Sequence, residues 1–298
     1  MISAHPSLPE FDYIKPQSLK EASEFLAGHP DESRPFMGGT DTFVRMRDGF
    51  WKDKYLVDVK GLDGMNLISF DAQKGLTIGA AVNMNKAAAS PIIQEHYPLL
   101  AEAAQSVASY QLRNRATICG NICNASPAGD TTGACLVYEG TLKVYGVNGY
   151  REETLAAFFK GPGKTVLKPG DVVISINLPI PPKGSQGKYW KLGRNKTGDL
   201  AIVGVAVLGY PDSKTTSGYG FRIALASVAA TPFIPKEAEK ILSGEKINDQ
   251  TIEKAAVTAM NSVKPIDDVR GSALYRKMMV RNLTHKAILD VWSALNRK

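Results

Sequence analysis

The amino-acid sequence predicts an α+β protein of two domains. Its 298 residues correspond to two domains at the usual size of about 100–200 residues each. Strand and helix patterns alternate through the first 180 residues, whereas the rest shows three strand patterns followed only by helix patterns. Successive strands followed by successive helices are typical of α+β domains. Hydrophobic residues at 44% and charged residues at 22% exclude disordered, collagen-like and coiled-coil proteins.

The domain boundary is expected near residue 180. Residues 179–187 read PIPPKGSQG, and this run of proline and glycine blocks both a helix and a central strand. Residues 1–180 carry 17 basic and 19 acidic side chains, a net charge of −2, whereas 181–298 carry 19 and 10, a net charge of +9. We therefore expect a first domain of 1–180, with subdomains of about 1–57 and 58–180, and a second of 181–298.

Local signals define the elements of the first domain. Ser18 and Glu21 form a capping box before a helix that ends near Gly28. The other expected elements are a helix at 42–47, a strand at 55–59, a hairpin of 67–70 with 76–80, a helix at 99–107, a strand at 142–147, a helix at 152–159 and a strand at 172–178. These elements show no regular strand–helix–strand repeat.

The second domain shows a simpler pattern. Strands are expected at 188–192, 201–208 and 220–230, and their close succession predicts an antiparallel sheet. Helical periodicity follows at 236–242, 249–262 and 272–295.

A first candidate binding loop is Met37, Gly38, Gly39, Thr40 and Asp41. Glycines after a strand let the backbone approach a ligand closely and direct N–H groups at an anion, and the Thr40 hydroxyl adds a donor. A pyrophosphate is held in this way, although a simple tight turn has the same pattern. Neither the dinucleotide fingerprint G-x-G-x-x-G nor a Walker phosphate loop is present.

A second candidate loop spans residues 113–130, where small residues, amides and hydroxyls are concentrated. Such a loop exposes many donors to a phosphate or a heterocycle. Asp130 at its end is a candidate acceptor for ribose hydroxyls or a ring N–H. It is equally a candidate cap for a helix that begins at Thr131.

The two loops resemble those of a known family. GGTD at 38–41 followed by RNRATICGNICNASPAGD at 113–130 resembles the flavin-binding medium subunit of the molybdenum hydroxylases, which include xanthine dehydrogenase and carbon monoxide dehydrogenase. KLGR at 191–194, DLAIV at 199–203, ASVAATP at 226–232 and DDVRGSALYR at 267–276 resemble later segments of the same family. The resemblance therefore covers nearly the whole chain.

The resemblance implies a vanillyl-alcohol-oxidase (PCMH)-type FAD-binding domain followed by the C-terminal domain of the carbon monoxide dehydrogenase flavoproteins, with FAD between them. By position, it assigns cofactor contacts to two pyrophosphate loops, to an extension of this cradle and to two residues near the isoalloxazine ring. These residues are Met37, Gly38, Gly39, Thr40 and Asp41; Thr117, Ile118, Cys119, Gly120 and Asn121; Ser126 and Asp130; and Lys191 and Asp199.

The function implied by the resemblance is that of an oxidoreductase subunit that transfers electrons. Electrons would come from a small [2Fe–2S] subunit, fed by a large molybdopterin subunit, and FAD would pass them to NAD, a quinone or another acceptor. A dimer of heterotrimers is the implied assembly. No catalytic side chain and no metal ligand are expected in this chain, because the flavin itself carries the chemistry.

Two other functional classes stay open. A stand-alone flavin-dependent oxidase or dehydrogenase of the same FAD-binding fold would need a general base over the flavin, for which the sequence offers no candidate. A flavin-free docking subunit would be expected to fill the two loops with bulky or acidic residues, whereas both keep glycine, threonine and asparagine. No recognisable residues in this sequence identify the organic substrate of the complex or its electron acceptor.

The cysteines depart from the family pattern. Cys119 stands before Gly120 where the family usually has two glycines, and Cys123 stands where it has a small residue. Cys119, Cys123 and Cys135 are too few for a disulfide framework, which agrees with a reducing compartment. They also supply three ligands at a spacing that fits no common iron–sulfur motif. We expect small buried thiols.

Composition narrows the partners and the location. The basic side chains of the second half are scattered, without aromatic interleaving or a reading module, which argues against nucleic acid. The longest nearly unbroken apolar stretch, 200–210, has eleven residues, short of the ~20 that span a bilayer. The N-terminus lacks the pattern of a signal peptide. We therefore expect a cytoplasmic protein without a membrane span.

Overall fold

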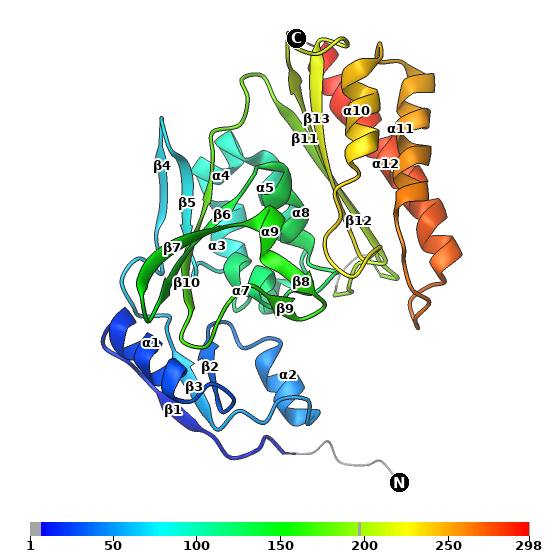
Figure 1. Ribbon diagram of the computed structural model, residues 1–298. Helices are drawn as coiled ribbons and strands as arrows, with labels where there is room; N and C mark the ends of the chain where they lie inside the picture. Colours follow the sequence, from blue (N-terminus) through cyan, green and yellow to red (C-terminus); the bar gives the residue numbers. More distant parts are fainter. Residues whose placement is uncertain (1–6, 196–197, 298) are drawn as a thin grey trace.

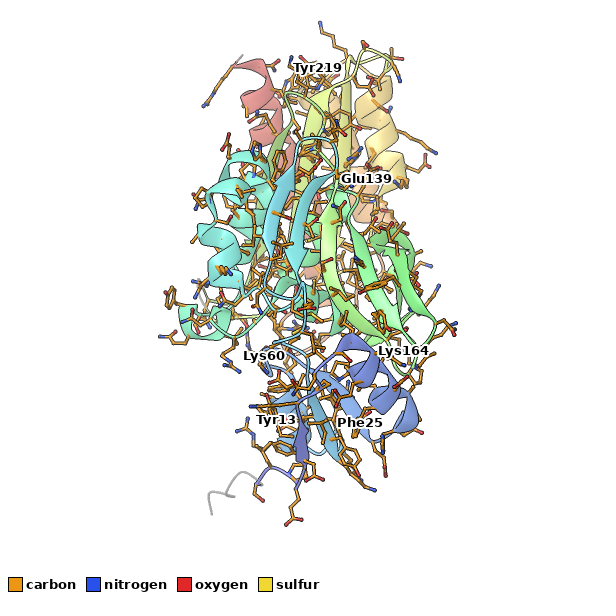
Figure 2. All side chains as sticks on the ribbon, turned by 90° about the vertical axis from the view of Figure 1, so that its left-hand side faces the viewer. Tyr13, Phe25, Lys60, Glu139, Lys164 and Tyr219 are labelled. Carbon is orange, nitrogen blue, oxygen red and sulfur yellow. The ribbon has the colours of Figure 1, made fainter. Side chains whose placement is uncertain are left out.

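The computed structural model describes residues 7–195 and 198–297. Three parts follow one another along the chain: a small N-terminal sheet with two helices, a larger five-stranded sheet with most of the short helices, and a three-stranded sheet with three long helices (Figure 1). Figure 2 shows this order in space, with Tyr13 and Phe25 in the N-terminal part and Tyr219 at the opposite end of the molecule.

The N-terminal part is a three-stranded parallel sheet with the order β1-β3-β2. Its elements are β1 (Asp12–Ile14), α1 (Leu19–Gly28), β2 (Ser33–Phe36), α2 (Thr42–Arg47) and β3 (Tyr55–Asp58). The Ser18 cap is confirmed, because its hydroxyl accepts a hydrogen bond from the Glu21 backbone N–H at 3.1 Å. The reciprocal half of the predicted capping box differs, since the Glu21 carboxylate accepts from the Gln17 backbone N–H at 2.6 Å. The sequence showed no regular strand–helix–strand repeat, yet β2 and β3 pair in parallel across α2, because strands of three or four residues are too short to show periodicity.

The five-stranded sheet is antiparallel throughout, in the order β4-β5-β10-β6-β7. The strands are β4 (Ile68–Asp71), β5 (Gly75–Gly79), β6 (Thr141–Gly146), β7 (Gly149–Thr154) and β10 (Val172–Leu178). The other elements of this part are α3 (Met84–Ala89), α4 (Pro91–His96), α5 (Pro98–Gln105), α6 (Tyr110–Arg113), α7 (Ile118–Cys123), α8 (Asp130–Val137), α9 (Leu155–Phe158), β8 (Phe159–Gly161) and β9 (Lys164–Thr165).

The helix expected at 152–159 is mostly wrong. Residues 149–154 form strand β7, and only 155–158 are helical. Strand β7 pairs with β6 across a tight turn in which Gly149 has a φ of 91°. Pairing with β6 therefore overrides the helical preference of the local sequence.

The C-terminal part contains the predicted three-stranded antiparallel sheet, in the order β11-β12-β13. Its elements are β11 (Gln186–Leu192), β12 (Val203–Pro211), β13 (Tyr219–Ala226), α10 (Lys236–Gly244), α11 (Asp249–Ser262) and α12 (Ala273–Asn296). In Figure 1 this sheet lies between α5 and α8 on one side and α10 to α12 on the other.

The central strand β12 belongs to two hydrophobic cores. Ala206 and Leu208 pack in the core shared with the five-stranded sheet, whereas Val205 and Val207 pack in the core of the C-terminal helices. Alternate side chains of a strand point to opposite faces of its sheet, so one strand joins the two cores. This packing fixes the C-terminal part against the five-stranded sheet.

Candidate functional site

A cleft of about 680 Å³ opens where the three parts of the molecule meet. The turn between β2 and α2, the loops around α7 and the segment before β12 all contribute to its walls. The cleft is lined by all of the predicted cofactor residues except Ile118 and Lys191: Met37, Gly38, Gly39, Thr40, Asp41, Thr117, Cys119, Gly120, Asn121, Ser126, Asp130 and Asp199.

The first loop contacts the second through Gly38. A Cβ atom on Gly38 would lie 2.2 Å from the Arg115 carbonyl oxygen, so only glycine allows this approach. Gly39 has a φ of 73°, which also favours glycine. Within residues 7–195 and 198–297, the backbone N–H groups of Gly39, Thr40 and Asp41 meet no acceptor. These donors are available to an anion in the cleft.

The second loop is ordered by side-chain hydrogen bonds around the short helix α7. The Thr117 hydroxyl caps this helix by accepting from the Gly120 N–H at 2.9 Å. The side-chain oxygen Oδ1 of Asn121 accepts from the Thr131 hydroxyl at 2.9 Å, which joins α7 to α8. Ile118 and Cys119 instead pack in the hydrophobic core. Cys119 also borders the cleft but is only 2% exposed, so the family departure at this position is accommodated by burial.

Asp130 forms a buried link between the first domain and strand β11. Its carboxylate accepts from the Tyr189 hydroxyl at 2.8 Å and from Lys191 Nζ at 2.7 Å, and Lys191 also donates to the Ser106 carbonyl at 3.1 Å. Burial raises the pKa of Asp130, while Lys191 and Tyr189 oppose this shift. Lys191 does not line the cleft itself, but it holds the carboxylate of Asp130, which does.

The alternative role of Asp130 as a helix cap is wrong. Asp130 is the first residue of α8, Gly129 occupies the cap position, and no side chain caps this end. The Asp130 carboxylate is instead engaged by β11, which the sequence around residue 130 does not reveal.

Asp199 lines the cleft from the C-terminal part. Its carboxylate accepts from the Arg194 backbone N–H at 2.7 Å and from the Arg194 guanidinium at 3.2 Å. These hydrogen bonds lower the pKa of Asp199 to about 2, so its carboxylate is anionic at neutral pH. Leu200, which is largely exposed, follows it on the same wall.

Several residues of the cleft were not predicted from the sequence, and three of them form a group of cationic and aromatic side chains. Arg34, Arg45 and Trp51 line the end formed by the N-terminal part. The Arg34 guanidinium lies 3.7 Å from the centre of the Trp51 ring, and the Arg45 guanidinium lies 5.1 Å from it. Both distances fit cation–π contacts. The sequence offered only a weak signal for this group, since the three residues come from β2, α2 and the loop after α2 and form no single motif.

Cys119 and Cys123 line the cleft, and Cys135 lies in the hydrophobic core. Burial raises the pKa of Cys123 and of Cys135 to about 12, and that of Cys119 well above its usual value. They are therefore neutral thiols at physiological pH.

Across the described residues, no group of three or more His, Cys, Asp or Glu side chains could hold a metal ion. No described helix has the length and apolarity to cross a bilayer.

Comparison with known proteins agrees with this geometry. Residues 9–181 match the family described as the FAD binding domain in molybdopterin dehydrogenase, and residues 188–291 match the CO dehydrogenase flavoprotein C-terminal domain. The glyceraldehyde dehydrogenase medium chain of Sulfolobus acidocaldarius is 31% identical, over 95% of this chain and 99% of that protein. The carbon monoxide dehydrogenase medium chain of Hydrogenophaga pseudoflava is 32% identical, over 96% and 98%.

The fold leads to the same group of proteins. A structure of carbon monoxide dehydrogenase from Hydrogenophaga pseudoflava superposes with a TM-score of 0.92, at 32% identity over 97% of this chain and 99% of that chain. Quinoline 2-oxidoreductase from Pseudomonas putida 86 superposes with a TM-score of 0.89 at 26% identity, over the same 97% and 99%.

The cleft has the features that an FAD-binding domain requires. Three features suit a dinucleotide with a pyrophosphate: a glycine at the close approach of two loops, backbone donors without an acceptor among the described residues, and a cleft of about 680 Å³. The resemblance read from the sequence is thereby confirmed. The chain belongs to the FAD-binding subunits of the molybdopterin dehydrogenases, the oxidoreductase family of the carbon monoxide and xanthine dehydrogenases.

Proposed function

We propose that FAD binds in this cleft and that the residues predicted from the sequence hold it. The observation that carries the proposal is the meeting of the two loops at Gly38 and Arg115, beside the N–H groups of residues 39–41, which have no acceptor in the part of the chain that the structure describes. Loops 37–41 and 117–121 hold the pyrophosphate, and Ser126 and Asp130 extend the cradle. Ile118 supports it from the core, and Lys191 supports it through Asp130.

The bound flavin supplies two-electron and one-electron redox chemistry. The chain binds it, orients it and surrounds it with fixed charges. Asp199 contributes an anionic carboxylate at the wall, and Lys191 neutralises the buried carboxylate of Asp130. Tyr189 holds the second oxygen of that carboxylate, which leaves Asp130 in one orientation.

We further propose that the chain is the medium subunit of a cytoplasmic molybdenum hydroxylase. A small [2Fe–2S] subunit delivers electrons that a large molybdopterin subunit takes from an organic substrate, and the flavin passes them to an acceptor such as NAD or a quinone. A dimer of heterotrimers is the expected assembly. In this proposal the flavin lies between a domain of 1–180 and a domain of 181–298. The family matches at 9–181 and 188–291 support this division.

The absorption spectrum of the purified chain tests the cofactor. We expect the bands of oxidised flavin, and acid release should yield FAD as identified by mass. A colourless chain that takes up no added FAD would instead favour the flavin-free docking subunit. Titration of the FAD-free chain with FAD, followed by quenching of flavin fluorescence, measures the affinity directly.

Turnover distinguishes the electron-transfer subunit from a stand-alone oxidase. We expect the isolated flavoprotein to be inactive towards purines, aldehydes and heterocycles, and to reduce an acceptor only when electrons arrive from its partners. Co-purification with a small iron–sulfur chain and a large molybdopterin chain, followed by determination of the mass of the complex, tests the assembly. Oxidation of an organic substrate by the isolated chain at a useful rate would contradict the proposal.

A further inference from the structure

Residues 267–276, the DDVRGSALYR segment, connect helix α12 to the wall of the cleft. Arg276 is only 1% exposed. Its Nη2 donates to Asp268 Oδ1 at 2.7 Å, and its Nη1 donates to the carbonyls of Ile202 at 2.6 Å and Ser227 at 3.1 Å. A buried arginine of the C-terminal helix thus holds the backbone two residues after Leu200, which lines the cleft.

Asp268 connects this arginine to a second one. It accepts from the Arg270 backbone N–H at 2.8 Å and from Arg270 Nη2 at 2.7 Å. Arg270 Nη1 in turn donates to the Ala201 carbonyl at 3.3 Å. Two consecutive carbonyls, those of Ala201 and Ile202, are therefore held by two arginines that share one carboxylate.

Ser227 extends the network to the opposite wall. Its hydroxyl donates to the Ala201 carbonyl at 2.8 Å, and its backbone N–H donates to the Pro127 carbonyl at 2.7 Å. The residues on either side of Pro127 line the cleft. Ser227 has a φ of 66°, a conformation that a serine adopts only under tertiary constraint. The network joins the cleft wall of the first domain to that of the second.

Stability alone is a weak explanation for this arrangement. A buried ion pair is often no more stabilising than apolar side chains of the same volume, because desolvation offsets the attraction. Arg276 Nε is also buried without an acceptor among the described residues. Such a pair is better explained by the geometry that it imposes, which here is the position of the segment that includes Asp199 and Leu200.

We propose that Arg276 and Asp268 form a positioning pair, which sets where Asp199 and Leu200 lie relative to the FAD and so tunes the oxidation–reduction equilibrium of that FAD. This inference rests on the proposed function of the cleft. A fixed anion near a flavin disfavours the gain of negative charge on the ring, and its effect depends on distance. Displacing the segment therefore changes the equilibrium without removing any residue that lines the cleft.

The first test uses the FAD-free chain and hydrogen exchange. Arg276→Lys and Asp268→Asn weaken the network, and Arg270→Lys is a milder change at a partly exposed side chain. Arg281→Lys is the matched control, because Arg281 lies on the same helix and pairs with Glu253 without reaching the cleft. We expect amide exchange in the 199–203 segment to accelerate roughly tenfold in the network variants, with no change in the control.

The second test compares the ratio of oxidised to reduced bound FAD between the variants and the wild type. At the potential that half-reduces the wild-type flavin, we expect the network variants to change the ratio of oxidised to reduced FAD by roughly threefold, with FAD content retained. Unchanged exchange and an unchanged ratio in folded variants would overturn the inference. If Arg276→Lys does not fold, Arg270→Lys decides the question on the same two readouts.

The two proposals fail in different ways. Absence of FAD binding by the wild-type chain overturns the proposed function, and the redox part of this inference with it. FAD binding by the wild type with equal flavin ratios in all variants overturns this inference alone.

Discussion

At the scale of single residues, Gly38 shows how two loops that are far apart in the sequence become one wall. Its Cα lies against the Arg115 backbone, where a side chain would overlap a carbonyl oxygen that belongs to the second loop. The requirement for glycine at position 38 is therefore set by another loop, whereas the positive φ of this turn belongs to Gly39.

Gly38→Ala is expected to separate the two loops. Overpacking of this kind costs about 1–3 kcal/mol. Because this cost destabilises the loop conformation that binds FAD, we expect FAD affinity to drop roughly ten- to hundredfold. Fluorescence titration of the FAD-free variant measures this. Gly61→Ala is the control, since a Cβ there meets nothing within 4 Å. Equal FAD affinity of the Gly38 variant and the wild type would show that the contact is not needed.

Lys191→Met is expected to leave the Asp130 carboxylate buried without its cation. Removing one partner of a buried ion pair costs about 3–5 kcal/mol. Because burial already raises the pKa of Asp130 in the folded chain, its contribution to stability is present below the unfolded value of 3.8 and is lost as pH rises through the folded value. Without Lys191 the folded pKa rises further.

The loss of stability in Lys191→Met should therefore be small near pH 4 and should increase towards pH 7. Urea unfolding at a series of pH values measures it. The double variant Asp130→Asn with Lys191→Met removes the buried charge and should recover most of the stability at neutral pH. A deficit that does not depend on pH would mean that the ion pair is not its cause.

At the scale of elements, short helices and strands depend on their contacts. Helix α7 has six residues, too few to be stable alone, and is held by its Thr117 cap and by Ile118 in the core. Strand β7 replaces much of an expected helix because pairing with β6 supplies the hydrogen bonds. Elements of this length are decided by neighbours that local sequence patterns do not contain.

Thr117→Val is expected to remove the cap of α7 while keeping the shape of the side chain. Loss of an N-terminal cap costs about 0.5–2 kcal/mol. Because α7 carries Gly120 and Asn121 on the cleft wall, FAD affinity should fall together with stability. Thermal unfolding and FAD titration measure both. Thr117→Ser keeps the hydroxyl and should resemble the wild type, so a similar loss in both variants would argue against the cap.

At the scale of the whole molecule, the three-stranded sheet is the shared wall of two cores. Side chains of β12 alternate between the core around α8 and the core of α10 to α12. Ion pairs and hydrogen bonds cross the same boundary, including Lys188 with Glu102 and Arg222 with Glu139. The core of the first half includes Tyr189, Ala206, Leu208 and Ala224 from the second half, whereas the core of α10 to α12 is built from second-half residues alone.

We therefore expect the chain to unfold in one cooperative transition. In calorimetry the measured enthalpy should equal the van't Hoff enthalpy, as for a two-state protein. A chain that ends at residue 181 would expose the apolar faces of α5 and α8 and should aggregate or bind a hydrophobic dye. Two separate transitions, or a well-behaved fragment, would show that the halves fold independently.

Much of the fold and of the candidate site could be predicted because the signals are local. The Ser18 cap, the three strands and three helices of the second half and the α+β class follow from spacing and turn residues. The glycines of loop 37–41 and the small polar residues of 113–130 indicated two candidate loops, and residues of both line the cleft.

The rest depended on contacts between distant segments. Arg34, Arg45 and Trp51 form one end of the cleft only after three elements come together. Asp130 changes from an expected cap to the partner of Tyr189 and Lys191, about 60 residues away along the chain.

The sequence by itself determined the class of the fold and the two candidate loops, because these depend on turn chemistry and periodicity that neighbouring residues encode. It indicated the family through the resemblance of its motifs. Only the tertiary structure decided which predicted residues line the cleft and which contact only the residues that line it. Ile118 lies in the core, and Lys191 and Arg276 act through other groups. The physical reason is that burial and ion pairing depend on which segments pack together, and packing is a property of the whole chain.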